Sequence, residues 1–168
     1  IRHFGEERAT IVGQDSGGFY AWHFAMTHPD QTERLVSLGT VHPAGLIREL
    51  ANDPDQQQTS TFQRGMWENP DAAAEFGARM RSIPAQPGDP LGELRREAFQ
   101  RLDAESVANF YKANWPRPPF GPETEGFGFS PGTFPAVQAP TLLIYGEDSG
   151  TIKPGTDSYT HLTQPPSD

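Results

Sequence analysis

The sequence predicts an α/β protein with a parallel sheet that is interrupted by a helical insertion. Three short apolar runs, residues 9–12 (ATIV), 35–38 (LVSL) and 140–145 (PTLLIY), are typical of buried parallel strands. A glycine turn and an apolar helical segment, residues 19–27, connect the first two runs, which makes a βαβ unit. Residues 44–136 contain no comparable strand pattern and read as helices and loops.

The turn after the first strand has the spacing of a nucleophile elbow. Gly13 and Gly17 lie two residues before and two residues after Asp15. A sharp strand-to-helix turn of this kind is strained, and larger flanking side chains would collide, while the central side chain is held out at the edge of the sheet. We therefore expect Asp15 to be the nucleophile, with the N–H of Ser16 placed to stabilise an oxyanion. A shift of one residue would make Ser16 the nucleophile, but Gln14 would then stand where a small residue belongs.

Composition excludes several classes of function. The net charge of −9 argues against a nucleic-acid partner, because such binding needs clustered Lys and Arg. No apolar run approaches the length of a membrane span, so no membrane partner is expected. No metal or phosphate-binding signature is found, so we expect no metal and no cofactor. The chain has no cysteine, which fits a reducing compartment, and we expect a cytoplasmic protein.

The insertion contains several expected helices. They cover residues 44–50, 56–67, 69–80 with Asn69 as N-cap, a stretch that begins at 89–90, and a stretch that begins after Asp103 as N-cap. Residues 115–137 are rich in Pro, Gly and Phe and indicate a long irregular loop. We therefore expect core segments 1–43 and 137–168 around a helical domain, residues 44–136.

The run VGQDSGG…AW…HPDQTERLVSLGTVHP resembles the α/β-hydrolase fold family, specifically its epoxide-hydrolase-like branch. The resemblance implies a partial α/β-hydrolase fold with residues 44–136 as its cap domain. It also implies that Asp15 attacks a small hydrophobic epoxide and that an ester forms. The chain starts with Ile, and residues 1–8 look like the tail of a helix, so we expect a piece of a longer protein.

The same resemblance implies roles for residues of the cap. Tyr111, in the run NFYKANW, matches the tyrosine that polarises the epoxide oxygen in that branch. Phe62 stands where a second catalytic tyrosine is usual, and it offers no proton donor. Ser16 stands where many relatives have a tryptophan that helps bind a leaving halide, so dehalogenation is disfavoured and Ser16 would contact the substrate. We expect apolar walls for this site from three further residues, Trp67, Phe110 and Trp115.

The second half of the reaction lacks an assigned base. Asp148 follows the third strand where the family places its triad acid, although the family spacing would select Ser149; the alternative is a solvated acidic turn. No histidine is assigned as the base that activates water. If the chain does contain such a base, His161 is the first candidate. We therefore expect the 168 residues to be inactive in multiple turnover. The alternatives are an esterase that uses Ser16, another cap-bearing hydrolase, or a non-catalytic binding protein.

Overall fold

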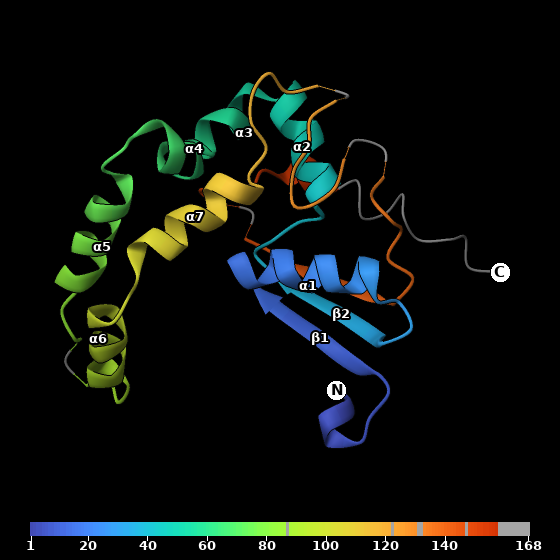
Figure 1. Cartoon of the computed structure of the whole chain (residues 1–168), viewed down its shortest axis with the longest axis horizontal. Helices are drawn as coiled ribbons and strands as arrows, with labels where there is room; N and C mark the ends of the chain where they lie inside the picture. The colour runs from blue at the N-terminus through green and yellow to red at the C-terminus, as the bar shows by residue number, and fades with distance from the viewer. Residues whose placement is uncertain (87, 122, 131–132, 147, 158–168) are drawn as a thin grey trace. The chain divides into compact units, whose positions relative to one another are not determined.

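The computed structural model describes residues 1–86, 88–121, 123–130, 133–146 and 148–157 of the 168. The elements in this part of the chain alternate between strand and helix only at the two ends of the sequence (Figure 1). In order they are η1 (Arg2–Phe4), β1 (Ala9–Gln14), α1 (Ser16–Thr27), β2 (Thr32–Leu38), α2 (Pro43–Asn52), α3 (Pro54–Thr59), α4 (Thr61–Glu68), α5 (Ala72–Ser82), α6 (Gly92–Gln100), α7 (Ala104–Asn114), β3 (Thr141–Ile144) and η2 (Pro154–Asp157).

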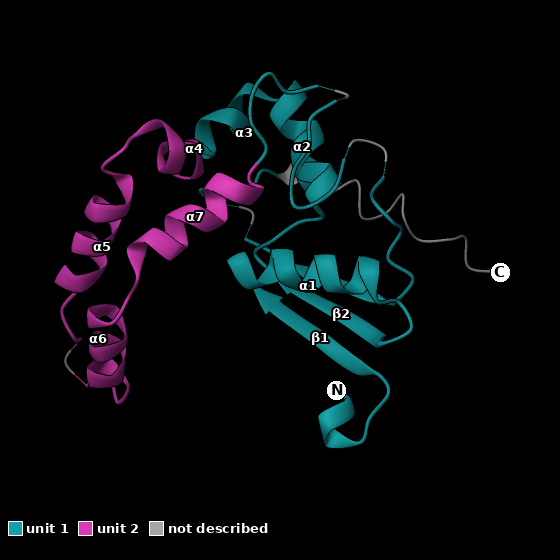
Figure 2. Cartoon of the chain, in the orientation of Figure 1, with its two compact units in different colours: residues 1–60, 116–168 teal, residues 61–115 magenta. Residues whose placement is uncertain are grey.

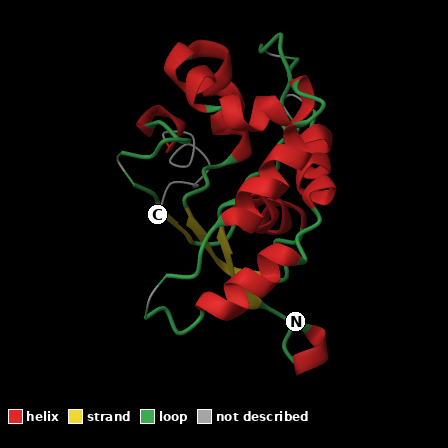
Figure 3. Ribbon diagram, turned by 90° about the vertical axis from the view of Figure 1, so that its left-hand side faces the viewer, coloured by secondary structure: helices red, strands yellow, loops and turns green. Residues whose placement is uncertain are grey.

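The three strands form one parallel sheet in the order β1-β2-β3, which confirms the expected parallel sheet. Figure 3 shows these strands in yellow. The register places Val12 beside Val36, and Val36 beside Leu142. Strand β1 is longer than the expected residues 9–12, because Gly13 and Gln14 continue the pairing with β2. The ends of β1 and β2 therefore reach the same edge of the sheet, where the turn with Asp15 begins.

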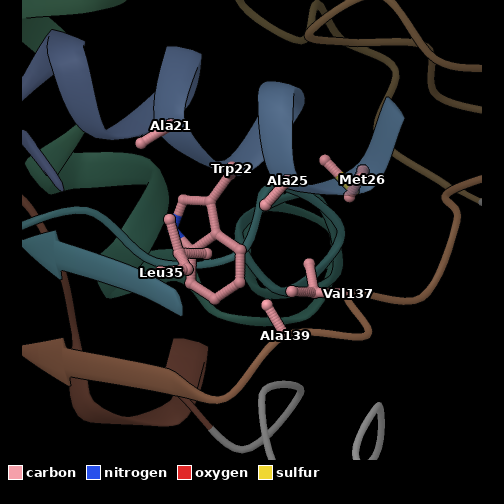
Figure 4. Close-up of a cluster of buried hydrophobic side chains, with 7 residues drawn as sticks. All are labelled: Ala21, Trp22, Ala25, Met26, Leu35, Val137 and Ala139. Atoms are coloured by element: carbon pink, nitrogen blue, oxygen red, sulfur yellow. The ribbon is translucent and has the colours of Figure 1, made fainter. Parts of the chain in front are cut away.

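Helix α1 packs one face against this sheet. Its buried residues recur every three or four positions, as an amphipathic helix requires, and are Gly18, Ala21, Trp22, Ala25 and Met26. All of them except Gly18 join Leu35 of β2 and two residues that precede β3, Val137 and Ala139, in a buried cluster (Figure 4). The sequence indicated an apolar surface on most faces of this helix, but Tyr20 is 62% exposed. The helix is thus fixed to the sheet by one side only.

The opposite face of the sheet is apolar and exposed. Val12 is 62% exposed, Leu142 is 53% exposed and Ile144 is 52% exposed. These side chains alternate along their strands with the residues that face α1, since successive strand residues point to opposite faces. One layer of helix therefore covers one face of the sheet within the described residues.

The chain forms two compact units (Figure 2). The first contains the sheet and comprises residues 1–60 and 116–168, and the second is the helical segment 61–115. Helices α2 and α3 thus belong to the first unit, although they fall inside the segment 44–136 that the sequence indicates as a cap domain. The domain limits 1–43, 44–136 and 137–168 stay a prediction.

Two details of the expected helices are wrong. The single helix expected over residues 56–67 is broken at Ser60, which leaves helical geometry with a ψ of 14°. The Ser60 hydroxyl donates to the carbonyl of Gln56 at 2.9 Å, a local bond of the kind that competes with helix continuation. Asn69 is not the N-cap of α5, because the helix begins at Ala72 after Asp71. The side chain of Asn69 instead accepts from the N–H of Asp71 at 2.9 Å.

Of the side-chain caps of α7 and α2, the sequence analysis expected the first and did not expect the second. Asp103 caps α7 as expected, with its carboxylate accepting from the N–H groups of Glu105 and Ser106. His42 caps α2 although histidine is not a usual N-cap residue: its Nδ1 accepts from the N–H of Ala44 at 3.1 Å. The His42 ring is fully buried, and its edge meets the Trp22 ring at 5.1 Å between centroids. Burial lowers the pKa of His42 from 6.5 to about 4, because the charged imidazolium would lose its hydration.

We expect His42 to make the fold sensitive to mild acid. Its pKa is lowered in the folded state, so its stabilising contribution is fully present above pH 6.5 and is lost as the pH falls towards 4. The loss over that window is roughly 3 kcal/mol in the free energy of unfolding. Urea unfolding at pH 7, 5.5 and 4.5 should show this loss in the wild type and a smaller one in His42→Asn, which keeps a capping acceptor but does not titrate.

The exposed residue His3 supplies the control for this comparison. His3→Asn should keep the pH dependence of the wild type, because the side chain of His3 is exposed and, unlike His42, loses no hydration in the folded state. Equal pH dependence in the wild type and in His42→Asn would contradict the role of the buried imidazole.

Candidate active site

Asp15 forms the apex of the turn between β1 and α1. Its backbone has a φ of 51° and a ψ of −127°, a conformation that L-residues rarely adopt. The Asp15 N–H donates to the carbonyl of Leu38 at 3.0 Å, and the Asp15 carbonyl accepts from the N–H of Gly18 at 2.8 Å. The strained residue is therefore held on both sides by backbone hydrogen bonds, as a strand-to-helix elbow requires.

The side chain of Asp15 is exposed and does not cap the helix that it precedes. Aspartate at an N-cap position normally accepts a hydrogen bond from the first turn of its helix. Asp15 occupies that position before α1 and makes no such bond. Asp15 thus directly precedes the first turn of α1 with a side chain that is exposed and makes no bond to that turn. An exposed carboxylate in this position is available to react with another molecule.

Thr40 holds this turn in place, and the sequence analysis missed it. Its hydroxyl donates to the carbonyl of Asp15 at 2.6 Å. Its own carbonyl accepts from the indole N–H of Trp22 at 3.0 Å and from the hydroxyl of Ser37 at 2.5 Å. Thr40 therefore joins the turn, α1 and the end of β2. A threonine after a strand carries no spacing signal that would have predicted this contact.

The glycines of the turn do not all serve the same purpose. A Cβ on Gly13 would lie 2.4 Å from the carbonyl oxygen of Gly17 and 2.7 Å from the Cβ of Ala21, closer than real contacts. A Cβ on Gly18 would lie 2.5 Å from the Cβ of Thr40. A Cβ on Gly17 would meet no atom within 4 Å. The expectation of collisions at both flanking positions is therefore correct for Gly13 and wrong for Gly17, and Gly18 is the second crowded position.

We expect Gly13→Ala and Gly17→Ala to separate these two cases. Gly13→Ala should lower the free energy of unfolding by about 1–3 kcal/mol, because the carbonyl that its methyl group meets belongs to the backbone and cannot rotate away. Gly17→Ala is the matched control: it adds the same methyl group inside α1 in open space. It should change stability by less than about 1 kcal/mol, or raise it, since alanine favours helix. Chemical unfolding of both variants checks the difference, and a larger loss in Gly17→Ala would contradict the packing described here.

Tyr111 lies in an aromatic cluster within the helical unit. It belongs to α7 and is buried. Its ring centroid lies 5.6 Å from that of Phe62, 5.2 Å from that of Phe110 and 6.0 Å from that of Trp115, each in an edge-on arrangement. Edge-on aromatic contacts fix the orientation of a ring. The predicted site residues Phe62, Phe110, Tyr111 and Trp115 are thus brought together, and Trp67 lies in α4 of the same unit.

Phe62 also lines a cavity of about 310 Å³ between α4 and α5. The guanidinium of Arg79 lies 5.7 Å from the centre of the Phe62 ring and 5.4 Å from that of Phe76. Met66 and Ala72 contribute further to the lining. Of these residues the sequence analysis singled out only Phe62, because the others lie on two helices whose packing no local pattern predicts.

The segment after β3 is tied to α3 by a buried glutamine. Asp148 lies exposed in a turn within this segment. The amide of Gln56, which is fully buried, donates to the carbonyl of Thr151 at 2.9 Å and accepts from the N–H of Lys153 at 2.9 Å. These bonds fix the chain soon after Asp148. The role of Asp148 as triad acid stays a prediction.

Among the described histidines we assign no base that Asp148 could orient. His161 lies outside the described residues. His42 is fully buried and accepts through Nδ1, so it is committed to capping α2.

No group of three or more His, Asp or Glu side chains in the described ranges could hold a metal ion. No helix in the described part of the chain is long and apolar enough to cross a membrane.

Asp15 and Tyr111 belong to different compact units. The expectation that they face one cavity therefore stays a prediction. The two units contribute different parts of the expected site: the first holds the elbow with Asp15 and Ser16, and the second holds the aromatic cluster around Tyr111.

A family comparison covers nearly the whole chain. The sequence model of the alpha/beta hydrolase fold family matches residues 1–161. Epoxide hydrolase 3 of Xenopus tropicalis is 28% identical over 159 residues, which cover 91% of this chain and 43% of that protein. The AB hydrolase superfamily protein YfhM of Bacillus subtilis (strain 168) is 42% identical over 43 residues, which cover 26% of this chain and 15% of that protein.

Solved structures with the same fold include two epoxide hydrolases. One belongs to a group of novel epoxide hydrolases found in metagenomes from hot environments: it has a TM-score of 0.73 and 24% identity, and the match covers 96% of this chain and 59% of that chain. The other is the epoxide hydrolase of Bacillus megaterium in complex with an inhibitor, with a TM-score of 0.74, 18% identity and coverage of 98% and 61%. The chain therefore spans less than half of either curated relative and about three fifths of the two solved chains.

Proposed function

We infer that this chain, which belongs to the alpha/beta hydrolase fold family, carries the nucleophile of an enzyme that opens an epoxide to a diol. The observation that carries the proposal is the state of Asp15: a strained backbone at an elbow and an exposed carboxylate that caps nothing. The likeness to proteins named as epoxide hydrolases supports the choice of an epoxide as substrate. Since the chain spans only part of those relatives, the activity is proposed for the whole enzyme.

The first step forms an ester on Asp15. One carboxylate oxygen attacks a ring carbon of the epoxide, the bond between that carbon and the epoxide oxygen breaks, and the oxygen takes a proton from an acid. Tyr111 is the acid that we propose, because its ring is fixed by Phe62, Phe110 and Trp115 and a phenol can donate to the departing oxygen. The product of this step is a monoester of a diol.

The second step releases the diol. Water attacks the carbonyl carbon of the ester, and an oxyanion forms that needs hydrogen-bond donors, for which the N–H of Ser16 is our candidate. Collapse of this intermediate breaks the bond between the carbonyl carbon and the alkyl oxygen, which leaves as an alkoxide and becomes the second hydroxyl group of the diol. The two protons of the water go to this alkoxide and to the Tyr111 phenolate, and Asp15 returns to its carboxylate form. Activation of the water needs a base, and we propose Asp148 as the acid that orients it, with no histidine assigned.

The aromatic residues favour a small hydrophobic substrate. Phe62 and Phe110 pack around Tyr111, and Trp67 and Trp115 lie on the same unit, so an epoxide held beside Tyr111 would meet mainly apolar rings. Phe62 has no hydroxyl group, so it cannot donate a proton to the epoxide oxygen beside Tyr111. The site would then depend on one phenol as its electrophile.

The main alternative is an esterase or another cap-bearing hydrolase with Ser16 as nucleophile. The backbone favours Asp15 over Ser16, because Asp15 holds the strained φ of the elbow apex while Ser16 is the first residue of α1. A non-catalytic binding protein is the other alternative, and it would bind epoxides or diols without forming an ester.

We expect Asp15→Asn and Ser16→Ala to decide between these functions. The chain is incubated with an excess of a reactive aryl epoxide, and its intact mass is followed with time. The wild type should gain the mass of one epoxide, localised to Asp15 by peptide mapping. Asp15→Asn should reduce that rate by roughly a thousandfold or more, because a carboxamide is a poor nucleophile. Ser16→Ala should stay within a few-fold of the wild type.

Each alternative predicts a different outcome. Loss of the adduct in Ser16→Ala but not in Asp15→Asn would support the serine enzyme and contradict our proposal. An adduct of equal rate in both variants would show alkylation elsewhere on the surface. Because no base is assigned, we also expect the ester to persist, and steady diol production by the isolated chain would contradict that part of the proposal.

A further inference from the structure

Phe127 has a backbone conformation that needs an explanation. Among the described residues, only Asp15 and Phe127 combine a side chain with a positive φ, and the φ of Phe127 is 55°. For a bulky residue this left-handed conformation is a clear outlier, and such residues cluster where structure serves function. A contact that offsets the strain at Phe127 should therefore exist.

The turn around Phe127 does not itself require phenylalanine. Gly126 and Phe129 exchange two backbone hydrogen bonds, of 3.2 Å and 3.1 Å, and the residues between them, Phe127 and Gly128, both have a positive φ. This is the pattern of a two-residue turn that favours Asn, Asp or Gly at the first central position. Phenylalanine at position 127 is therefore unfavourable for the turn itself. Its presence there must be explained by what its ring contacts.

The ring of Phe127 is buried on the first turn of α1. It stacks on the ring of Phe19, with centroids 4.3 Å apart and planes inclined by 13°. Phe127 is 6% exposed. Phe19 is four residues after Asp15, in the turn that carries the Ser16 N–H and the hydrogen bond from Gly18 to Asp15. The two strained residues of the described chain are thus connected through a single turn of helix.

The turn that carries Phe127 is itself closely packed against other residues of the first unit. A Cβ on Gly126 would lie 2.8 Å from the ring of Pro116 and 3.3 Å from the end of the Ile47 side chain. On the other side, the ring of Phe129 lies 5.0 Å from that of His23 in α1. The turn therefore cannot move away without loss of these contacts, and the position of the Phe127 ring is set by packing on both sides.

We propose that Phe127 is a positioning residue for the elbow: its ring holds Phe19 and so fixes the first turn of α1 behind Asp15. Through that turn it sets where the carboxylate of Asp15 and the N–H of Ser16 lie. The inference rests on the proposed role of Asp15, and it adds a residue from a distant loop to the machinery that the elbow needs. We call this contact of Phe127 with Phe19 the clamp. Hydrogen exchange measures how firmly the clamp holds the first turn of α1, and the rate of ester formation measures the chemistry, so the two can fail separately.

The test compares Phe127→Gly with Phe24→Leu in the full chain. Phe127→Gly removes the ring and also relieves the strained backbone, so the fold should survive. Hydrogen exchange of the backbone amides of residues 18–21 should become about tenfold faster, as expected for the loss of one stacked aromatic pair. Exchange in β2, residues 32–38, should not change. Phe24→Leu is the matched control, because it removes a stacked ring from the other end of α1, where Phe24 lies on His28 with ring centroids 4.7 Å apart, and it should leave residues 18–21 within twofold of the wild type.

The second readout is formation of the ester with a reactive aryl epoxide, followed by intact mass at several epoxide concentrations. Phe127→Gly should lower the rate at saturating epoxide about tenfold and leave the half-saturating concentration nearly unchanged, because the clamp orients the nucleophile and does not touch the substrate. Phe127→Tyr keeps the stacked ring and should restore both the exchange protection and the rate.

Three outcomes would overturn the proposal. Unchanged exchange at residues 18–21 in Phe127→Gly would show that the ring holds nothing there. Faster exchange in β2 to the same degree would show a general packing role. A normal saturating rate with a loosened turn would show that the elbow does not need the clamp. Absence of an ester in the wild type would instead defeat the proposed role of Asp15, and the exchange result would still decide whether Phe127 holds the turn.

Discussion

The strained backbone of Asp15 is the constraint on which the first unit is built. A positive φ with a strongly negative ψ is unfavourable for an aspartate, so the surrounding structure must hold it. The Leu38 carbonyl, the Gly18 N–H and the Thr40 hydroxyl bind the backbone of this one residue. These groups come from the end of β2, from the first turn of α1 and from the loop after β2. All three must be in place before Asp15 can adopt its conformation.

The core beneath α1 supports this arrangement. Trp22 is fully buried against the sheet, and its indole N–H donates to the Thr40 carbonyl, so one side chain contributes to the packing and to the hold on the elbow. Val137, at the end of the long loop, and Ala139, just after it, complete the same cluster. The loop is therefore a structural part of the unit. This explains how a chain with a modest content of hydrophobic residues still orders the turn that presents its carboxylate.

The sequence predicted what depends on local patterns. The three strands and their parallel order follow from short apolar runs joined by a helix, and the elbow follows from glycine spacing. Gly18, Thr40 and Phe127 were missed because their importance comes from contacts between segments far apart in the chain. The break at Ser60 was missed because the pattern of residues 56–67 gives no signal for it, and the structure shows the Ser60 hydroxyl donating to the carbonyl of Gln56 at that point. The relation of Asp15 to Tyr111 depends on how two units meet, which neither spacing nor composition can predict.

The central claim is that the fold stores strain at Asp15 in order to present its carboxylate, and a comparison of Asp15→Gly with Asp15→Ala tests it most directly. Both variants remove the carboxylate, but only glycine adopts the observed backbone conformation without strain. The free energy of unfolding, measured with urea at neutral pH, should be about 1–2 kcal/mol higher for Asp15→Gly than for Asp15→Ala. Asp15→Gly should also be at least as stable as the wild type. A glycine variant that is equal to or less stable than the alanine variant would contradict the account.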